Sequence, residues 1–283
     1  MSVQIITDSA SDITQQQAAE LGIRVLPLRT IFGDEVYRDG IDMSHREFYQ
    51  KLVETDQMPT TSQIPPIEYE EAFRAVKEAG DTAVYISISS KLSGCNQSAN
   101  IAVEDYADCV QVVDSVNVCI GEQILVKRAI QLRDQGKSAR EIADVLNEEK
   151  GNIRLIALLD TLEYLKKGGR ISSTAAFAGT LLSIKPVIAI EQGEVAVVGK
   201  ARGSKNGHNL LTQLVEKEGG INFGMPYVLG YTGLSDELLQ KYVADSKHLY
   251  EGQSEPLPVS TIGSTIGTHS GPGGIAAAFF VNG

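Results

Sequence analysis

The chain is poor in several residue types, and each shortage excludes a class of protein. Its 283 residues include only three cysteines, and no C-x-x-C pair is present. This pattern gives neither a metal-binding nor a disulfide framework, and it suits a reducing compartment, so we expect a cytoplasmic protein. The first residues, MSVQIITDSASD, lack the basic segment and long apolar run of a secretory signal.

Basic residues are also scarce, with 25 lysines and arginines against 36 acids and a net charge of −11. An acidic surface repels nucleic acid and anionic membranes. We therefore expect that the protein has no nucleic-acid partner and is not a DNA-linked regulator. The longest apolar runs, such as AAAFFV, are too short to cross a bilayer, which argues against stable membrane insertion. A dinucleotide enzyme is disfavoured because no G-x-G-x-x-G follows the first strand.

The first half of the sequence alternates between strand and helix patterns. VQIITD, TAVYISIS and CVQVVD are short β-branched runs that predict buried strands. Helices are predicted between them, two of which begin at the capping boxes Ser44–Glu47 and Ser138–Glu141. Such alternation is typical of a parallel sheet with helices on its faces.

The alternation of strand and helix patterns ends in the second half, where two apolar runs flank EQGE in KPVIAIEQGEVAVVGKA. This pattern predicts a hairpin and therefore antiparallel pairing. We predict an α/β protein of two domains: an N-terminal α/β domain over residues 1–155, and an α+β domain with a largely antiparallel sheet over residues 156–283. Binding sites often lie in the crevice between two such domains.

Two polar stretches in the first half are candidates for a site. PTTSQ, residues 59–63, clusters hydroxyls that either cap a helix or point into a pocket. SISSKLSGCNQSA, residues 87–99, passes from a strand through a Ser/Gly turn into a helix. Ligands of open parallel sheets bind beyond the carboxyl ends of strands, and a helix start favours an anion. Ser93 and the backbone N–H of Gly94 either hold a carboxylate or form an ordinary helix cap.

Two glycine-rich stretches in the second half carry a cation or a titratable group. KKGGRIS, residues 166–172, leads into Arg170, which is either a solvated surface residue or a bidentate partner for a carboxylate or phosphate. GTHSGPGG, residues 267–274, predicts a loop whose bare backbone lets a ligand approach His269, unless the loop is only a turn with an exposed histidine. The other three histidines fall on predicted helices, and we expect them at the surface.

TDSASD, residues 7–12, is a weaker candidate because it ends the first strand and borders the same crevice. Its Asp8 is equally suited to an Asx turn. Neither this stretch nor any other pair of acids has the spacing of metal ligands, so no metal site is predicted.

These motifs occur together in a known family. ITDSASD, TTSQ, KLSGCNQSA, KKGGRIS and GTHSGPGG follow one another in the order found in DegV proteins, which the chain resembles over nearly its whole length. The family comprises bacterial fatty-acid-binding proteins, including the lipid-carrying subunit of fatty acid kinase. The resemblance implies a two-domain protein that holds one long-chain fatty acid in a tunnel between its domains, with no other cofactor.

The resemblance also implies roles for particular residues. The carboxylate-binding group falls on Thr61, Ser93, Gly94 and His269, and Arg170 faces the head group or the kinase. The protein would be a carrier without its own catalysis, and a separate ATP-dependent subunit would phosphorylate the bound carboxylate for phospholipid synthesis. Small residues suit the tunnel wall, and the tail contacts expected from STAAFAGTLLSIKPVIAI are Phe177, Leu181, Leu182 and Ile184, unless this segment is ordinary core.

One alternative of another class is open, namely a stand-alone serine hydrolase or acyltransferase with Ser93 as nucleophile and His269 as base. A serine at a strand-to-helix turn favours this hypothesis. The sequence KLSGC lacks the G-x-S-x-G elbow, however, and no acid that would orient the histidine is evident.

Overall fold

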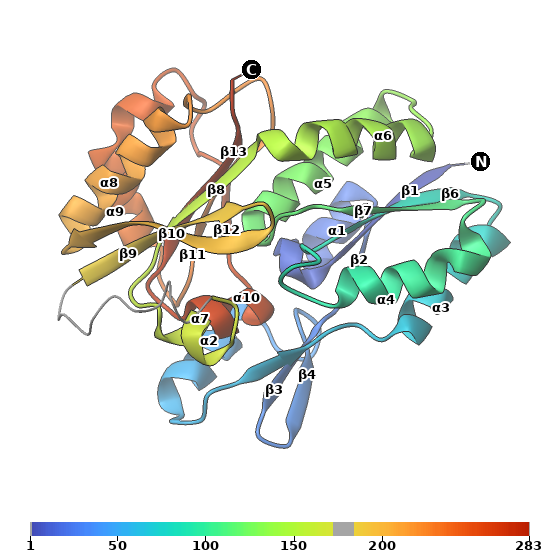
Figure 1. The fold of residues 1–283 in the computed structure, drawn as a ribbon, viewed down its shortest axis with the longest axis horizontal. Helices are drawn as coiled ribbons and strands as arrows, with labels where there is room; N and C mark the ends of the chain where they lie inside the picture. The colour runs from blue at the N-terminus through green and yellow to red at the C-terminus, as the bar shows by residue number, and fades with distance from the viewer. Residues whose placement is uncertain (1, 172–183, 283) are drawn as a thin grey trace.

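The computed structural model describes residues 2–171 and 184–282. Two β-sheets stand side by side with helices around them, and a small third sheet lies below the junction (Figure 1). Both chain termini lie at the upper end of this view, away from the third sheet. The predicted α/β class is therefore confirmed.

The N-terminal sheet is entirely parallel, with strand order β2-β1-β6-β7. Its strands are β1 (Val3–Asp8), β2 (Arg24–Leu26), β6 (Thr82–Ser87) and β7 (Val110–Asp114). The helices of this half are α1 (Gln15–Leu21), α2 (His45–Glu54), α3 (Pro66–Glu78), α4 (Cys95–Ala102), α5 (Cys119–Asp134) and α6 (Ala139–Glu149), with short 3-10 turns η1 (Ser9–Ser11), η2 (Val103–Tyr106) and η3 (Lys150–Asn152). Both predicted capping boxes are present, at Ser44–Glu47 and Ser138–Glu141.

The C-terminal sheet has the order β10-β9-β8-β13-β11-β12 and is antiparallel except for its last pair. Its strands are β8 (Ile153–Leu158), β9 (Ile184–Glu191), β10 (Glu194–Arg202), β11 (Tyr227–Tyr231), β12 (Val259–Thr261) and β13 (Ile275–Phe280). The helical segments are α7 (Glu163–Lys167), α8 (Ser204–Lys217), α9 (Glu237–Asp245), η4 (Lys247–Tyr250) and α10 (Ser264–Ser270). The β9–β10 hairpin turns at Gln192 and Gly193, both left-handed, as EQGE predicted.

A third sheet was not predicted from the sequence. It is antiparallel, has the order β4-β3-β5, and consists of β3 (Arg29–Phe32), β4 (Glu35–Arg38) and β5 (Thr60–Ser62). Thr61 therefore sits on a strand and pairs with Thr30, so the clustered hydroxyls of PTTSQ are not a helix cap. Together with α2, α7 and α10, this sheet lies beneath the space between the two larger sheets (Figure 1).

Helix α5 packs between the two large sheets and contacts β1 and β6 on one side and β8, β11 and β13 on the other. Eleven of the sixteen residues of α5 are buried. A helix that is covered on most of its surface is expected to bury residues all round and not along one stripe. One hydrophobic core consequently runs through both sheets. The domain division at residue 155 stays a prediction, and the C-terminal sheet begins two residues earlier, at Ile153.

His208 corrects one expectation. The sequence placed it at the surface of a helix, but it is only 3% exposed in α8, where its Nδ1 lies 2.9 Å from a carboxylate oxygen of Asp245. A buried imidazole needs such a partner, and here the partner comes from α9, 37 residues away.

Candidate functional site

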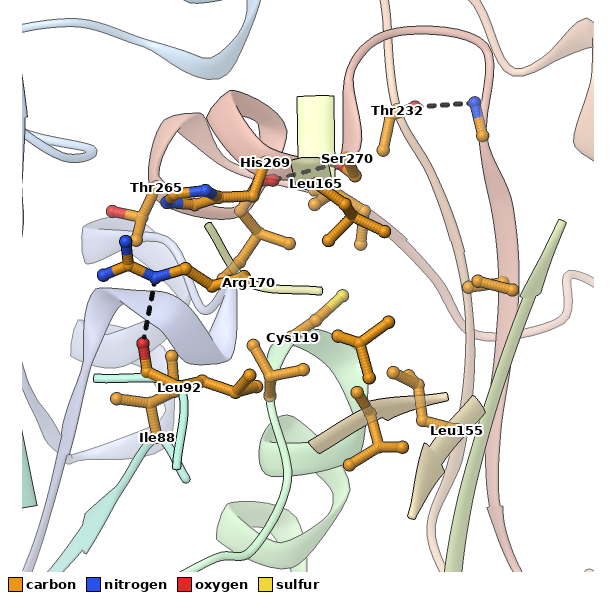
Figure 2. A pocket seen from close by; sticks show the side chains of 18 of the residues that line it. Ile88, Leu92, Cys119, Leu155, Leu165, Arg170, Thr232, Thr265, His269 and Ser270 are labelled. Carbon is orange, nitrogen blue, oxygen red and sulfur yellow. Dashed lines mark hydrogen bonds between the residues drawn. The ribbon is translucent and has the colours of Figure 1, made fainter. Parts of the chain in front are cut away.

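A cavity of about 370 Å³ lies between the two large sheets. This volume is at the lower end of the range of small-molecule sites, which is about 300–1,000 Å³. Leu155, Ala157, Ile188 and Ile190 line it from the C-terminal sheet, and Ile88, Leu92, Val118 and Cys119 line it from the opposite side. Figure 2 shows Arg170, Leu92 and His269 on one side of this pocket and Leu155 across from them. The interior is therefore mainly hydrocarbon, with a polar group at one side.

The polar group consists of the residues that the sequence singled out. Thr61, Ser93, Gly94, Arg170 and His269 all line this one cavity, although they lie on four separate segments of the chain. Ser93 and Gly94 follow β6 and precede α4, Arg170 follows α7, and His269 comes from the last turn of α10. Their predicted roles at a ligand remain predictions, but their proximity is a feature of the fold.

His269 differs from the prediction in one respect, because it lies on a helix and not in a loop. The helix begins where the buried carboxylate of Asp39 accepts hydrogen bonds from the backbone N–H and hydroxyl of Ser264 and of Thr265, at 2.6–3.3 Å. This carboxylate satisfies N–H groups that a helix start leaves free. The loop suggested by the glycines begins only after His269, at the left-handed Gly271 and Gly273.

Nε2 of His269 lies 2.9 Å from Oγ1 of Thr61, and its Nδ1 is buried without a partner in the described chain. Burial, and then the nearby guanidinium of Arg170, lower the pKa of His269 to about 4. The ring is therefore neutral near pH 7 and carries one proton. If that proton is on Nε2, the ring donates a hydrogen bond to Oγ1 of Thr61, and the unpartnered Nδ1 carries no hydrogen. The Thr61 hydroxyl can then donate its own hydrogen to another acceptor.

Gly168 fits closely against this histidine. A Cβ placed on Gly168 would be 2.1 Å from Nδ1 of His269 and 2.8 Å from Cε1, far inside contact distance. Its φ of −76° is ordinary, so the requirement for glycine is steric. The next residue, Gly169, has φ +68° and open space around its Cα. The two glycines of KKGGRIS therefore serve different purposes, close approach at the first and a left-handed turn at the second.

Ser93 and Gly94 are positioned by the turn into α4. The hydroxyl of Ser93 accepts a hydrogen bond from the N–H of Cys95 at 3.3 Å, which leaves its own hydrogen available to donate. A Cβ on Gly94 would be 1.9 Å from Oε1 of Gln63, whose Nε2 donates to Ser98. Gln63 also lines the cavity, and sequence reasoning missed it although it is the last residue of TTSQ.

Arg170 lies at the opening of the cavity. Its guanidinium donates to the carbonyls of Leu92 and Gly168, at 3.2 and 2.8 Å, while the residue as a whole is exposed (Figure 2 shows the first of these bonds). A second, polar hollow of about 630 Å³ adjoins the first and shares Leu92, Ser93, Gly94, Arg170 and Val195 with it. The polar end of the apolar cavity thus opens beside Arg170.

The predicted tail contacts are only partly within the described chain. Phe177, Leu181 and Leu182 lie outside the described residues. Ile184 begins β9 and is absent from the lining of the cavity, whereas Ile188 and Ile190, further along the same face of that strand, are part of it.

The TDSASD stretch borders neither hollow in the described structure. Asp8 forms the Asx turn considered from the sequence, since its Oδ1 accepts from the N–H of Ala10, and it also accepts from Tyr85 and from the N–H of Ile88. Burial raises the pKa of Asp8 to about 6. Asp12 accepts from the N–H of Gly263, just before α10. The motif therefore joins the first strand to the helix that carries His269.

Ser93 and His269 do not form a nucleophile–base pair in this structure. The imidazole engages Thr61, and the Ser93 hydroxyl accepts from a backbone N–H. A serine hydrolase requires a hydrogen bond between nucleophile and base, with a third group orienting the base. This geometry gives no support to the hydrolase alternative.

The described residues, 2–171 and 184–282, contain neither a metal-binding cluster nor a membrane-spanning helix. No three side chains of His, Cys, Asp or Glu gather there in a way that would hold a metal ion. None of the helices in that part of the chain has both the length and the apolar character needed to cross a bilayer.

Comparison with known proteins identifies the family. Residues 2–282 match the family model "Uncharacterised protein, DegV family". The chain belongs to the DegV family. A DegV domain-containing protein of Caldanaerobacter subterraneus is 35% identical over 282 residues, which cover 98% of each chain. Another, from Clostridium perfringens, is 36% identical over 288 residues, covering 97% of this chain and 96% of the relative.

Solved structures of DegV proteins share the whole fold. A DegV family protein from Thermus thermophilus, whose name refers to fatty acid binding, has TM-score 0.87 and 31% identity, and the match covers 99% of this chain and all of that one. Bacillus subtilis DegV, named a fatty acid binding protein, has TM-score 0.85 and 27% identity over the full length of both chains. The DegV-like arrangement of a parallel and a largely antiparallel sheet is thereby established.

Proposed function

We propose that this DegV protein binds a long-chain fatty acid in the cavity between its sheets, with the carboxylate among Thr61, Ser93, Gly94 and His269. The observation that carries the proposal is an apolar cavity whose polar end gathers the hydroxyls of Thr61 and Ser93 beside a buried histidine, which contacts Thr61 at 2.9 Å. The names of the Thermus and Bacillus relatives, which refer to fatty acid binding, support it.

A fatty acid suits this cavity for two physical reasons. Each methylene removed from water contributes roughly 0.8 kcal/mol, so a tail of about fifteen methylenes offers on the order of 12 kcal/mol before ordering costs. The carboxylate, in contrast, is costly to bury unless it accepts hydrogen bonds. The hydroxyls of Thr61 and Ser93 and the N–H of Gly94 supply them. The neutral His269 then directs the Thr61 hydrogen toward the ligand by donating to its oxygen.

In the second part of the proposal, the protein presents the bound acid to a separate ATP-dependent kinase subunit. That partner would convert the carboxylate to an acyl phosphate for phospholipid synthesis in the cytoplasm, and this chain would act as carrier without its own catalysis. Support comes from the position of Arg170, a cation at the opening beside the head-group residues. A guanidinium suits both a carboxylate and an incoming phosphoryl group.

Mass spectrometry tests the binding proposal. Purified protein should show, under native conditions, an added mass in the range of a long-chain fatty acid that is lost on denaturation. Thr61→Ala and Ser93→Ala should retain markedly less lipid, because each removes one donor to the carboxylate. Thr60→Ala is the matched control, since Thr60 neighbours Thr61 on β5 but is exposed and outside the cavity lining. Equal lipid in all four proteins would refute the assignment.

The kinase proposal has its own test. Arg170→Ala should reduce acyl phosphate formation by a fatty acid kinase subunit supplied with ATP, while leaving lipid content near that of wild type. Loss of lipid without any further loss in phosphoryl transfer would contradict the separate role of Arg170.

A further inference from the structure

The floor of the cavity is a row of side chains that crosses the C-terminal sheet at right angles to its strands. Ile188 of β9 is paired with Ala157 of β8, Ala157 with Ala276 of β13, and Ala276 with Gly230 of β11. All four residues line the cavity. Leu155 and Leu159, two residues either side of Ala157 on the same face of the chain, also line it and are bulkier. The floor is therefore a trough whose lowest points are two alanines and a glycine.

The trough is closed at Gly230. A Cβ on Gly230 would lie 2.9 Å from Cδ1 of Ile262 and 3.2 Å from Cδ1 of Ile120, so these two side chains rest directly on the glycine. Ile262 is 2% exposed and lines the cavity, and Ile120 behind it is fully buried. Ile262 consequently forms the wall at which a chain lying in the trough would end.

The opposite end of the trough leads to the opening. Val195 of β10 lines both the apolar cavity and the polar hollow beside Arg170, and it pairs with Ile190 of β9. From β9 to β11 there are three strand spacings, or about 14 Å. An extended carbon chain advances about 1.2 Å per bond, so roughly a dozen carbons fit over this span.

We propose that Ala157, Ala276, Gly230 and Ile262 determine the length of the acyl chain that this protein accepts. The tail crosses the strands from the opening near Val195 and ends against Ile262. This inference rests on the proposed fatty acid binding and goes beyond it, because it assigns chain-length selection to the trough and its end wall.

The inference predicts opposite shifts from two kinds of substitution. Ala276→Val adds two carbons to the floor of the trough, so the longest acid that wild type binds well should bind about 15-fold more weakly, at about fourfold per displaced methylene. An acid about four carbons shorter, whose tail ends before it reaches Ala276, should be nearly unaffected, because one strand spacing of about 4.8 Å separates Ala276 from Gly230. Ile262→Ala removes three carbons from the end wall and should improve binding of an acid two carbons longer by a similar factor. Ile262→Val, a milder change, should improve it about fourfold.

The experiment measures the affinity of delipidated protein for straight-chain saturated acids that differ by two carbons, by displacement of a fluorescent fatty acid. Ala189→Val is the matched control, because Ala189 neighbours Ile188 on β9 but points to the other face and is outside the lining. Circular dichroism melts confirm that each variant is folded.

The outcomes separate this inference from the proposed function. Opposite shifts for Ala276→Val and the Ile262 variants, with none for Ala189→Val, would support it. The trough assignment fails, and the binding proposal stands, if wild type binds fatty acids but no variant alters the length preference. The same conclusion follows if Ala276→Val weakens the binding of acids of every length equally. If wild type binds no acid of the series, the proposed function itself fails.

Discussion

Replacing Gly168 with alanine tests how the polar end of the cavity is built. The new Cβ would lie 2.1 Å from Nδ1 of His269, whereas ordinary contacts begin at 3.4 Å, so the ring has to move by more than 1 Å. Such a shift breaks the 2.9 Å contact between His269 and Thr61. The lost hydrogen bond costs about 0.5–1.5 kcal/mol, and overpacking costs about 1–3 kcal/mol. We therefore expect Gly168→Ala to lower the free energy of unfolding by about 2–4 kcal/mol.

A double-mutant cycle separates this clash from a general effect on the turn. In a His269→Ala background the obstructing ring is gone, and the backbone of Gly168, at φ −76°, accepts alanine without strain. The cost of Gly168→Ala should then fall below about 1 kcal/mol, which gives a coupling energy of at least ~1 kcal/mol. Gly169→Ala is the control, since its φ of +68° imposes roughly 1 kcal/mol of strain whether or not His269 is present.

Urea denaturation of the delipidated proteins, followed by circular dichroism, measures all of these free energies. The same variants should be tested for fatty acid retention, which Gly168→Ala should reduce because the Thr61 hydroxyl loses its partner. If Gly168→Ala costs the same with and without His269, the close approach of glycine to imidazole has no energetic role and the reasoning is refuted.

Two further predictions concern stability. Asp39→Ala leaves three buried donors without an acceptor, namely the backbone N–H groups of Ser264 and Thr265 and the Thr265 hydroxyl, because the Ser264 hydroxyl also lies 2.8 Å from that of Thr30. The variant should lose about 3 kcal/mol or more of unfolding free energy, with Asp39→Asn less damaging, and equal thermal melts for wild type and the alanine variant would exclude the capping role. His269 has a pKa near 4 when folded and an ordinary value of 6.5, so its contribution is complete above pH 6.5 and is lost as the pH falls toward 4. Asp8, raised to about 6, acts with the opposite sign. Subtracting the unfolding free energy of wild type from that of His269→Asn isolates the contribution of the histidine. From pH 7 to pH 4 the variant should gain about 3 kcal/mol of stability relative to wild type, and a constant difference would contradict the lowered pKa.

The features predictable from the sequence are those that depend on neighbours in the chain. The capping boxes at Ser44–Glu47 and Ser138–Glu141 need residues three positions apart, and the β9–β10 hairpin needs only its two runs and the turn between them. The strand–helix alternation likewise follows from local hydrophobic periods. These local signals were sufficient for the fold class and for most elements.

The features that were missed depend on contacts between distant parts of the chain. Helix α10 has the sequence STIGTHS, which is poor in strong helix formers, and its start is held by Asp39, 225 residues before Ser264. Strand β5 is three residues long and is defined by its pairing with β3. Gln63 is recognisable only once Gly94 is seen to lie against it. The glycines of GTHSGPGG indicated a turn correctly but gave no sign that His269 precedes it.

The continuous core through both large sheets, with α5 buried between them, has a consequence for how the protein can be divided. Cutting the chain near residue 155 would strip one side of α5 and expose the apolar inner faces of both halves, so neither half is suited to independent expression. Melting should accordingly occur as a single cooperative event. Any molecule held in the interior would then raise the melting temperature of the entire protein, by mass action on the folded state.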